Sequence, residues 1–323
     1  MKIAPGVRLN FSKSTLGLSF GVPGARVSIN TRGDIYGSAG IPGTGLYNVE
    51  RASLRARKGR RKKTLPGELV QKIAPPSFFS ARNKKALFRA LKEGNIESLE
   101  RVATNFPEIS YICNALIFPK LLMGSTSDVE GLCAKAEALW KRRTELENNP
   151  LFFEYAKGFE LTLIVAPGVS IPMQYGVIAL GLSYVELLQL DKRYEEALTV
   201  AESLPANQGT ALAVCENELQ LGRWQDVLET TDEIENVDEA TALLLIYRAI
   251  ALRETGMFDA AIEALRLARS SKKRHEDVLN KALYERALTY KSLGKATQAK
   301  KDLEKIIATD SDFPGVTELL KSL

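Results

Sequence analysis

Few residues in this 323-residue sequence are of the types that usually perform chemistry. The sequence has one histidine, His275, in the charged run 270–277, and three cysteines, Cys113, Cys133 and Cys215, with no Cys-x-x-Cys pair. A zinc site needs three or four such ligands close together, so no metal is predicted. The odd number and wide spacing of the cysteines favour buried thiols in a reducing, cytoplasmic compartment over disulfides. We expect His275 to lie in a solvent-exposed loop.

Two further patterns are similar to catalytic motifs but lack essential parts. Segment 40–45, Gly-Ile-Pro-Gly-Thr-Gly, looks like the start of a phosphate-binding loop, but Leu-Tyr follows where that loop needs Lys and Ser or Thr. Glu195 and Glu196 are adjacent carboxylates on the polar side of a predicted helix, which is typical of a solvated face. No set of base, nucleophile and oxyanion donor can be assembled, so the sequence predicts no catalytic residue, no cofactor and no enzyme activity.

Positive charge is concentrated in one short segment of the chain. The formal net charge is +5, of which residues 1–50 carry +3 and residues 51–63 carry +8, leaving −6 for the remainder. The basic residues of this segment are Arg51, Arg55, Arg57, Lys58, Arg60, Arg61, Lys62 and Lys63. Such a block repels itself, and we expect a solvated linker that continues through a proline-containing stretch to residue 78. The same segment also fits contact with nucleic acid phosphates, an anionic membrane surface or the acidic body.

Residues 1–50 show the alternation of apolar and polar residues that is typical of strands. Apolar residues alternate with polar or small ones over 7–12, 16–21 and 26–30, and turn residues separate these runs. The pattern predicts about four short strands in a β-meander. The segment has neither cysteine nor histidine, so neither a disulfide nor a metal can stabilise so small a unit. We therefore expect it to dock on the rest of the chain, to pair with copies of itself or to fold on a partner, and a loosely ordered tail is the alternative.

Three motifs in this segment resemble a known family. They are KIAPGVRLNFSKS at 2–14, GARVSIN at 24–30 and GIPGTGLY at 40–47. In this order they resemble a glycine-rich bacterial family classified only as a domain of unknown function, number 4236, over residues 1–48. The resemblance implies a module and supplies no activity.

From about residue 79 the apolar residues follow a helical period. Residues 79–103 predict a helix–turn–helix pair broken at Gly94, and residues 128–148 and 151–165 predict two further helices. The body of the chain is therefore expected to be mostly α-helical.

One uncharged stretch could be mistaken for a membrane span. It runs from Leu161 to Val185 and contains Pro167 and Pro172 near its centre. A membrane-spanning helix rarely accepts two prolines there. We expect the end of one helix, a buried loop and the start of another.

The C-terminal half of the sequence repeats itself. Gly222 and Trp224 recur 34 residues later as Gly256 and Phe258, and Gly294 follows Gly256 after 38 residues. Each copy lies between two amphipathic segments. Tyr-Glu-Glu-Ala, thirty residues before the tryptophan, marks a fourth, more divergent copy.

This spacing resembles tetratricopeptide repeats over about residues 178–313. The resemblance implies a superhelix in which the first helix of each pair lines a concave groove. The residues predicted to line it and bind a partner are Glu216, Gln220, Ile250, Arg253, Glu254, Lys281, Tyr284 and Lys291. They are apolar with both signs of charge, so an extended or helical protein segment is the expected ligand. The alternative for each residue is packing against helix 79–103 or the C-terminal helix near Val316–Leu323.

The sequence therefore predicts an α+β protein: a small N-terminal β-meander module (1–50), a basic linker (51–78) and a mostly α-helical tetratricopeptide-like superhelix (79–323). We expect a non-enzymatic scaffold that binds a protein partner, with residues 1–50 mediating docking or self-association into a homo-oligomer. The alternative function is attachment to nucleic acid or an anionic membrane through residues 51–63. No small-molecule substrate is predicted.

Overall fold

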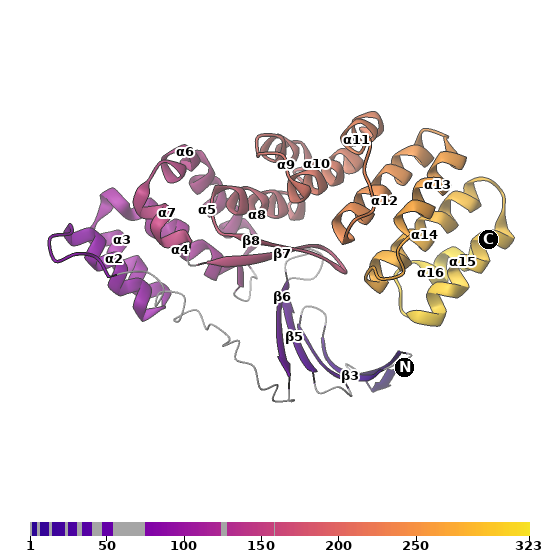
Figure 1. Ribbon diagram of the computed structural model, residues 1–323, viewed down its shortest axis with the longest axis horizontal. Helices are drawn as coiled ribbons and strands as arrows, with labels where there is room; N and C mark the ends of the chain where they lie inside the picture. The colour runs from indigo at the N-terminus through magenta and orange to yellow at the C-terminus, as the bar shows by residue number, and fades with distance from the viewer. Residues whose placement is uncertain are drawn as a thin grey trace. The chain divides into compact units, whose positions relative to one another are not determined.

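The computed structural model describes residues 2–4, 7–12, 15–22, 25–30, 34–40, 47–53, 75–123, 128–157 and 159–323 (Figure 1). The chain forms two compact units. Unit 1 comprises Met1–Leu163 and Pro172–Lys192, and unit 2 comprises Ile164–Ile171 and Arg193–Leu323.

The N-terminal strands form a six-stranded antiparallel meander in which each strand pairs with the next along the chain (Figure 1). The strands are β1 (Lys2–Ala4), β2 (Val7–Ser12), β3 (Thr15–Val22), β4 (Ala25–Asn30), β5 (Asp34–Gly40) and β6 (Tyr47–Ser53). The register sets Leu18 between Leu9 on one side and Ile29 on the other, as expected from alternating apolar residues. The meander has six strands rather than about four. β1 is too short to show alternation and β6 carries charged residues, so the pattern missed them.

Unit 1 also contains a set of helices. They are α2 (Arg82–Glu93), α3 (Ile96–Asn105), the 3₁₀ helix η2 (Pro107–Ile109), α4 (Ser110–Met123), α5 (Val129–Lys141), α6 (Arg143–Glu147), α7 (Pro150–Ala156) and α8 (Val177–Leu190). The predicted first pair is confirmed: Gly94 ends α2 with φ 73°, and the side chain of Asn95 accepts a hydrogen bond from Ser98 N at 2.7 Å to begin α3. The sequence did not predict α4, because this helix is apolar on most sides and contains Pro119.

The uncharged stretch forms a β-hairpin where a helix end and a buried loop were expected. Its strands are β7 (Glu160–Ala166) and β8 (Val169–Gln174), joined by Pro167 and Gly168, and Gly168 has φ 79°. The helix expected over 151–165 ends at Ala156. The expectation was wrong because a short apolar run shows neither period clearly, and its β-branched residues favour a strand. None of the described helices is long and apolar enough to cross a lipid bilayer.

Unit 2 is built from helices that pair along the chain (Figure 1). They are α9 (Tyr194–Glu202), α10 (Gln208–Gln220), α11 (Trp224–Thr230), α12 (Glu239–Glu254), α13 (Phe258–Ala268), α14 (Glu276–Ser292), α15 (Ala296–Thr309) and α16 (Val316–Lys321). Three helices, α10, α12 and α14, pack in succession, and each also packs against the helix that follows it. This alternation of contacts is the arrangement expected of stacked helix pairs.

A residue in the left-handed conformation lies in the turn before the second helix of each pair. Gly222, Gly256 and Gly294 have φ values of 70°, 81° and 69° in the turns that lead into α11, α13 and α15. Lys192 holds the equivalent place before α9 and has φ 58°. Glycine adopts this conformation without steric cost, whereas a lysine does not.

A small side chain follows each of these turns after five residues. Ala197, Val227, Ala261 and Ala299 are each 0% exposed. Their small size lets the second helix of a pair lie close to its neighbours. The turns predicted at Gly222, Gly256 and Gly294 are thus confirmed.

The loop that lengthens one repeat from 34 to 38 residues is fastened to the loop before it. Arg274 donates from Nε to Asn236 Oδ1 at 2.8 Å and from Nη2 to Asn236 O at 3.0 Å. Asn236 Nδ2 in turn donates to the carbonyl oxygens of Leu267 and Ala268, each at 2.8 Å. The inserted residues therefore reach back to the preceding repeat, and the same asparagine satisfies carbonyls at the end of α13.

The replacement Lys192→Gly should stabilise the protein by about 0.5–1 kcal/mol. It removes the strain of a lysine in the left-handed conformation, and this gain exceeds the extra conformational entropy that a glycine loses on folding. Thermal unfolding followed by circular dichroism measures the change. The control Lys300→Gly, in the exposed interior of α15, should instead destabilise by about 1 kcal/mol. A melting temperature for Lys192→Gly below that of the wild type would contradict the strained-turn interpretation.

Candidate partner-binding surface

The eight residues predicted to bind a partner all lie on the first helices of the pairs in unit 2. α10 carries Glu216 and Gln220, α12 carries Ile250, Arg253 and Glu254, and α14 carries Lys281, Tyr284 and Lys291. Three of them are exposed, namely Gln220, Glu254 and Lys291, and the other five are half-buried. Because α10, α12 and α14 pack in succession, these residues lie on a run of adjacent helices.

Arg253 is engaged within the protein. Its Nη1 lies 2.7 Å from Glu285 Oε2, and the two side chains are only 13% and 9% exposed. Burial opposes the charge of Arg253, but hydrogen bonds to Glu285 and Glu254 hold its pKa above the usual value. Lys281 Nζ lies 3.9 Å from the other oxygen of Glu285. This buried ion pair ties α12 to α14, so Arg253 first of all joins adjacent repeats.

A second buried ion pair ties α14 to α15. Arg286 donates from Nε and Nη2 to the two carboxylate oxygens of Asp302 at 2.7 and 2.8 Å, and Lys305 Nζ lies 2.9 Å from Asp302 Oδ1. Burial would raise the pKa of Asp302, but the hydrogen bonds from Arg286 and Lys305 hold that pKa below its usual value. The paired forked geometry is the strong form of this interaction.

Two of the predicted residues lie against the C-terminal segment. The ring of Tyr284 is 5.8 Å from that of Phe313, and a Cβ added at Gly315 would come within 2.5 Å of the Tyr284 hydroxyl. Lys291 Nζ donates to Ser322 Oγ at 2.8 Å. The chain's own end therefore contacts this part of α14, which leaves the exposed residues of α10 and α12 as the more open part of the surface.

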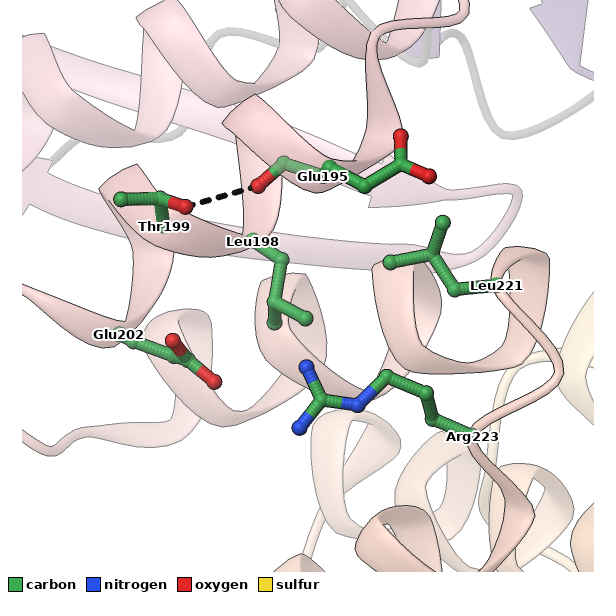
Figure 2. Close-up of a pocket in the computed structure, with 6 residues that line it drawn as sticks. All are labelled: Glu195, Leu198, Thr199, Glu202, Leu221 and Arg223. Atoms are coloured by element: carbon green, nitrogen blue, oxygen red, sulfur yellow. Dashed lines mark hydrogen bonds between the residues drawn. The ribbon is translucent and has the colours of Figure 1, made fainter.

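A polar hollow of about 380 Å³ lies between α9 and the turn that leads into α11 (Figure 2). It is lined by Glu195, Leu198, Thr199, Glu202, Leu221 and Arg223. The hydroxyl of Thr199 donates to the carbonyl oxygen of Glu195 at 2.9 Å (Figure 2). Arg223 also pairs with Asp226. Glu195 is exposed, as the sequence predicted, and its neighbour Glu196 pairs with Arg193 at 2.6 Å.

A buried carboxylic acid stands close to this hollow. Glu218 of α10 is 3% exposed, and among the described residues its Oε2 has no hydrogen-bond partner. Burial raises the pKa of Glu218 to about 7, and the nearby carboxylates of Asp226 and Glu202 act in the same direction while Arg223 opposes them. The one hydroxyl in the described lining, that of Thr199, donates to the carbonyl oxygen of Glu195. The sequence signal that could have found it is a single Glu three residues after Cys215, on a buried face.

His275 lies at the start of a helix, and the three cysteines are buried. The imidazole Nδ1 of His275 lies 3.3 Å from Asp277 N at the start of α14 and 3.2 Å from Asp277 Oδ2, and this contact raises its pKa. A Cβ added at Gly168 would come within 2.5 Å of the same nitrogen, so the hairpin turn lies close against the His275 side chain. His275 is exposed as predicted, but it also caps a helix. The three cysteines are free and buried, which confirms that prediction.

The described part of the chain contains no group of three or more His, Cys, Asp or Glu side chains that could hold a metal. Of the predicted basic patch, Arg51 lies on β6, opposite Tyr36 on β5. The other seven residues, Arg55, Arg57, Lys58, Arg60, Arg61, Lys62 and Lys63, lie outside the described residues.

Two family models match the sequence. Residues 1–49 match the family described as protein of unknown function (DUF4236), which confirms the resemblance of the N-terminal motifs. Residues 130–322 match the family described as T7SS, ESX-1 secretion system protein EccA1, N-terminal domain. No curated protein matches the chain.

Several solved structures are similar to this one. The N-terminal domain of the EccA1 ATPase from the ESX-1 secretion system of Mycobacterium tuberculosis is 16% identical over 74% of this chain and 88% of that chain, with a TM-score of 0.53. YrrB, a TPR protein with an unusual peptide-binding site, is 15% identical over 71% and 100%, with a TM-score of 0.43. A tetratricopeptide repeat protein from Parabacteroides merdae is 13% identical over 74% and 97%, with a TM-score of 0.43. The first likeness shows the fold of the helical part.

The replacement Glu218→Gln should stabilise the protein at pH 8 by about 2 kcal/mol and have little effect below pH 4.5, since it removes a buried acid that ionises near neutrality. The pKa of Glu218 is raised from 4.5 to about 7 in the folded chain. The stability that the protonated acid supplies is therefore complete below the lower value and is lost as the pH rises through the higher one. Thermal unfolding from pH 4 to pH 9 measures this difference.

The exposed variant Glu195→Gln is the control for this measurement. The stability of this variant should differ from that of the wild type by a small amount that is constant across the pH range. A Glu218→Gln difference that does not grow between pH 5 and pH 8 would show that the acid is not buried as described.

Proposed function

The chain belongs to the family of the T7SS, ESX-1 secretion system protein EccA1, N-terminal domain, and from this premise we propose that it is a non-enzymatic scaffold whose helical repeats bind a protein partner. The observation that carries the proposal is the succession of α10, α12 and α14, which sets exposed polar and half-buried apolar side chains on adjacent helices. Stacked helix pairs commonly offer an extended concave surface to protein segments. We place the scaffold in the cytoplasm, in keeping with its three free cysteines.

The open part of this surface is the contact region that we propose for the partner. Gln220 and Glu254 are exposed, and Ile250 lies half-buried between them in sequence. The exposed Glu254 and the half-buried Lys281 carry opposite charges, so the charges near this part of the surface are mixed. A partner segment that combines apolar side chains with a few charges of both signs fits this mixture.

Photo-cross-linking of the full chain tests the proposal directly. A photoreactive benzoylphenylalanine placed at Gln220 or at Glu254 should give a discrete adduct with one partner in the cells that produce the protein. The same group at Lys300, exposed on α15, is the control and should give none. Adducts that are absent at both positions, or equally strong at all three, would rule out a partner on this surface.

We further propose that the N-terminal module mediates docking or self-association. Among the described strands, β1 and β6 form the two edges of the meander. An open edge offers backbone hydrogen-bonding groups to a further strand.

Light scattering separates self-association from docking on the body. The full chain should have a mass larger than that of a monomer, because copies pair through residues 1–50, and the fragment 64–323 should be a helical monomer. Monomeric behaviour of both would contradict self-association and leave docking within one chain as the role of the module.

A further inference from the structure

Two adjacent phenylalanines at the start of the helical part of unit 1 stand almost fully in solvent. The side chains of Phe78 and Phe79 are 84% and 93% exposed, and the two rings contact each other edge to face at 5.5 Å. Each ring left in water forgoes the free energy that burial of an aromatic side chain supplies. A contiguous apolar pair of this kind marks a surface that meets something else.

A cationic stripe begins directly after this pair. Arg82, Lys85, Arg89 and Lys92 follow one another at spacings of three, four and three residues, so they lie on one face of α2. The opposite face is buried through Leu87, Phe88, Ala90 and Leu91. Within the part of the chain that the structure describes, none of the four cations forms an ion pair with a carboxylate, whereas their neighbour Lys84 pairs with Glu154 at 2.7 Å. No carboxylate among the described residues neutralises this stripe, and Arg82, Arg89 and Lys92 are exposed.

The phenylalanines and the stripe form one continuous surface. Lys85 donates to the carbonyl oxygen of Phe78, and its Nζ lies 5.1 Å from the centroid of that ring. Lys92 lies similarly over Phe88, at 5.4 Å, which keeps its charge at the end of the stripe. Apolar rings beside unpaired cations complement a layer that has a hydrocarbon interior beneath anionic groups.

We propose that Phe78, Phe79 and the cationic face of α2 bind an anionic lipid surface. The two rings enter the boundary between headgroups and acyl chains, and the four cations contact the lipid phosphates. Single-stranded nucleic acid fits less well, because bases stack on ring faces. Here the two rings are inclined at 88° to each other and an ammonium group already lies over one of them. The inference concerns unit 1 and does not depend on the scaffold function proposed for unit 2.

Co-sedimentation of the full chain with lipid vesicles tests the proposal. Vesicles of phosphatidylcholine with about 30% phosphatidylglycerol should bind the protein in about 0.1 M salt, and vesicles of phosphatidylcholine alone should not. The double variant Phe78→Ser/Phe79→Ser should weaken binding about tenfold or more. Its matched control is Phe153→Ser, because Phe153 is 61% exposed and also has a lysine, Lys157, over its ring at 4.4 Å, but lies on α7 and not on the segment that leads into α2. This control should bind as the wild type does.

A charge variant tests the stripe separately. Arg82→Gln/Arg89→Gln should weaken binding by about tenfold and flatten its salt dependence. The control Lys300→Gln/Lys301→Gln removes the same charge from α15 and should leave binding unchanged. All the substituted side chains are exposed, and circular dichroism of each variant verifies that its helical content is preserved.

Four results would overturn the proposal. The first is no binding of the full chain to anionic vesicles, and the second is equal loss in a variant and its control, which would show that the replaced side chains make no specific contact. The third is loss of binding to a single-stranded oligonucleotide in Phe78→Ser/Phe79→Ser while vesicle binding persists, which would assign the surface to nucleic acid. The fourth is a mass of Phe78→Ser/Phe79→Ser by light scattering that differs from that of the wild type while vesicle binding is unchanged. This result would assign the rings to contact between copies.

Discussion

The helix pairs of unit 2 depend on one backbone constraint, a single residue held in the left-handed conformation between two helices. Gly222, Gly256 and Gly294 satisfy it without strain. The turn sets the second helix antiparallel to the first, and the fully buried small residue five positions later lets the two approach closely. Stacking, the succession of first helices and the surface they carry all follow from this local geometry.

Charge joins the pairs that the turns create. The body of the chain is acidic overall. Two of its carboxylates, Glu285 and Asp302, form buried ion pairs with Arg253 and Arg286. α14 contributes one member to each pair, so it is held on both sides, by α12 and by α15. Removing one partner of such a pair would leave a buried charge without compensation, which is why these residues serve packing before recognition.

Local patterns in the sequence were enough to predict the repeats, the first helix pair and the alternation of the N-terminal strands. Gly222 and Trp224 predict a turn because the conformation of a turn depends on only a few neighbouring residues. The sequence did not predict the hairpin β7–β8, because a continuous run of apolar residues shows neither the helical nor the strand period. Glu285 and Glu218 were missed because their roles depend on residues about one repeat away or on burial, and neither is visible in a single stretch of sequence.

The contact between Arg274 and Asn236 gives the stack a property that its helices alone do not supply. In a one-dimensional array of repeats, cooperativity is set by the coupling between nearest neighbours. Asn236 binds both the end of α13 and the loop that precedes α14, so three successive segments share one set of hydrogen bonds. Opening of any one of these segments breaks contacts of the other two, so the shared hydrogen bonds favour unfolding of the three segments together.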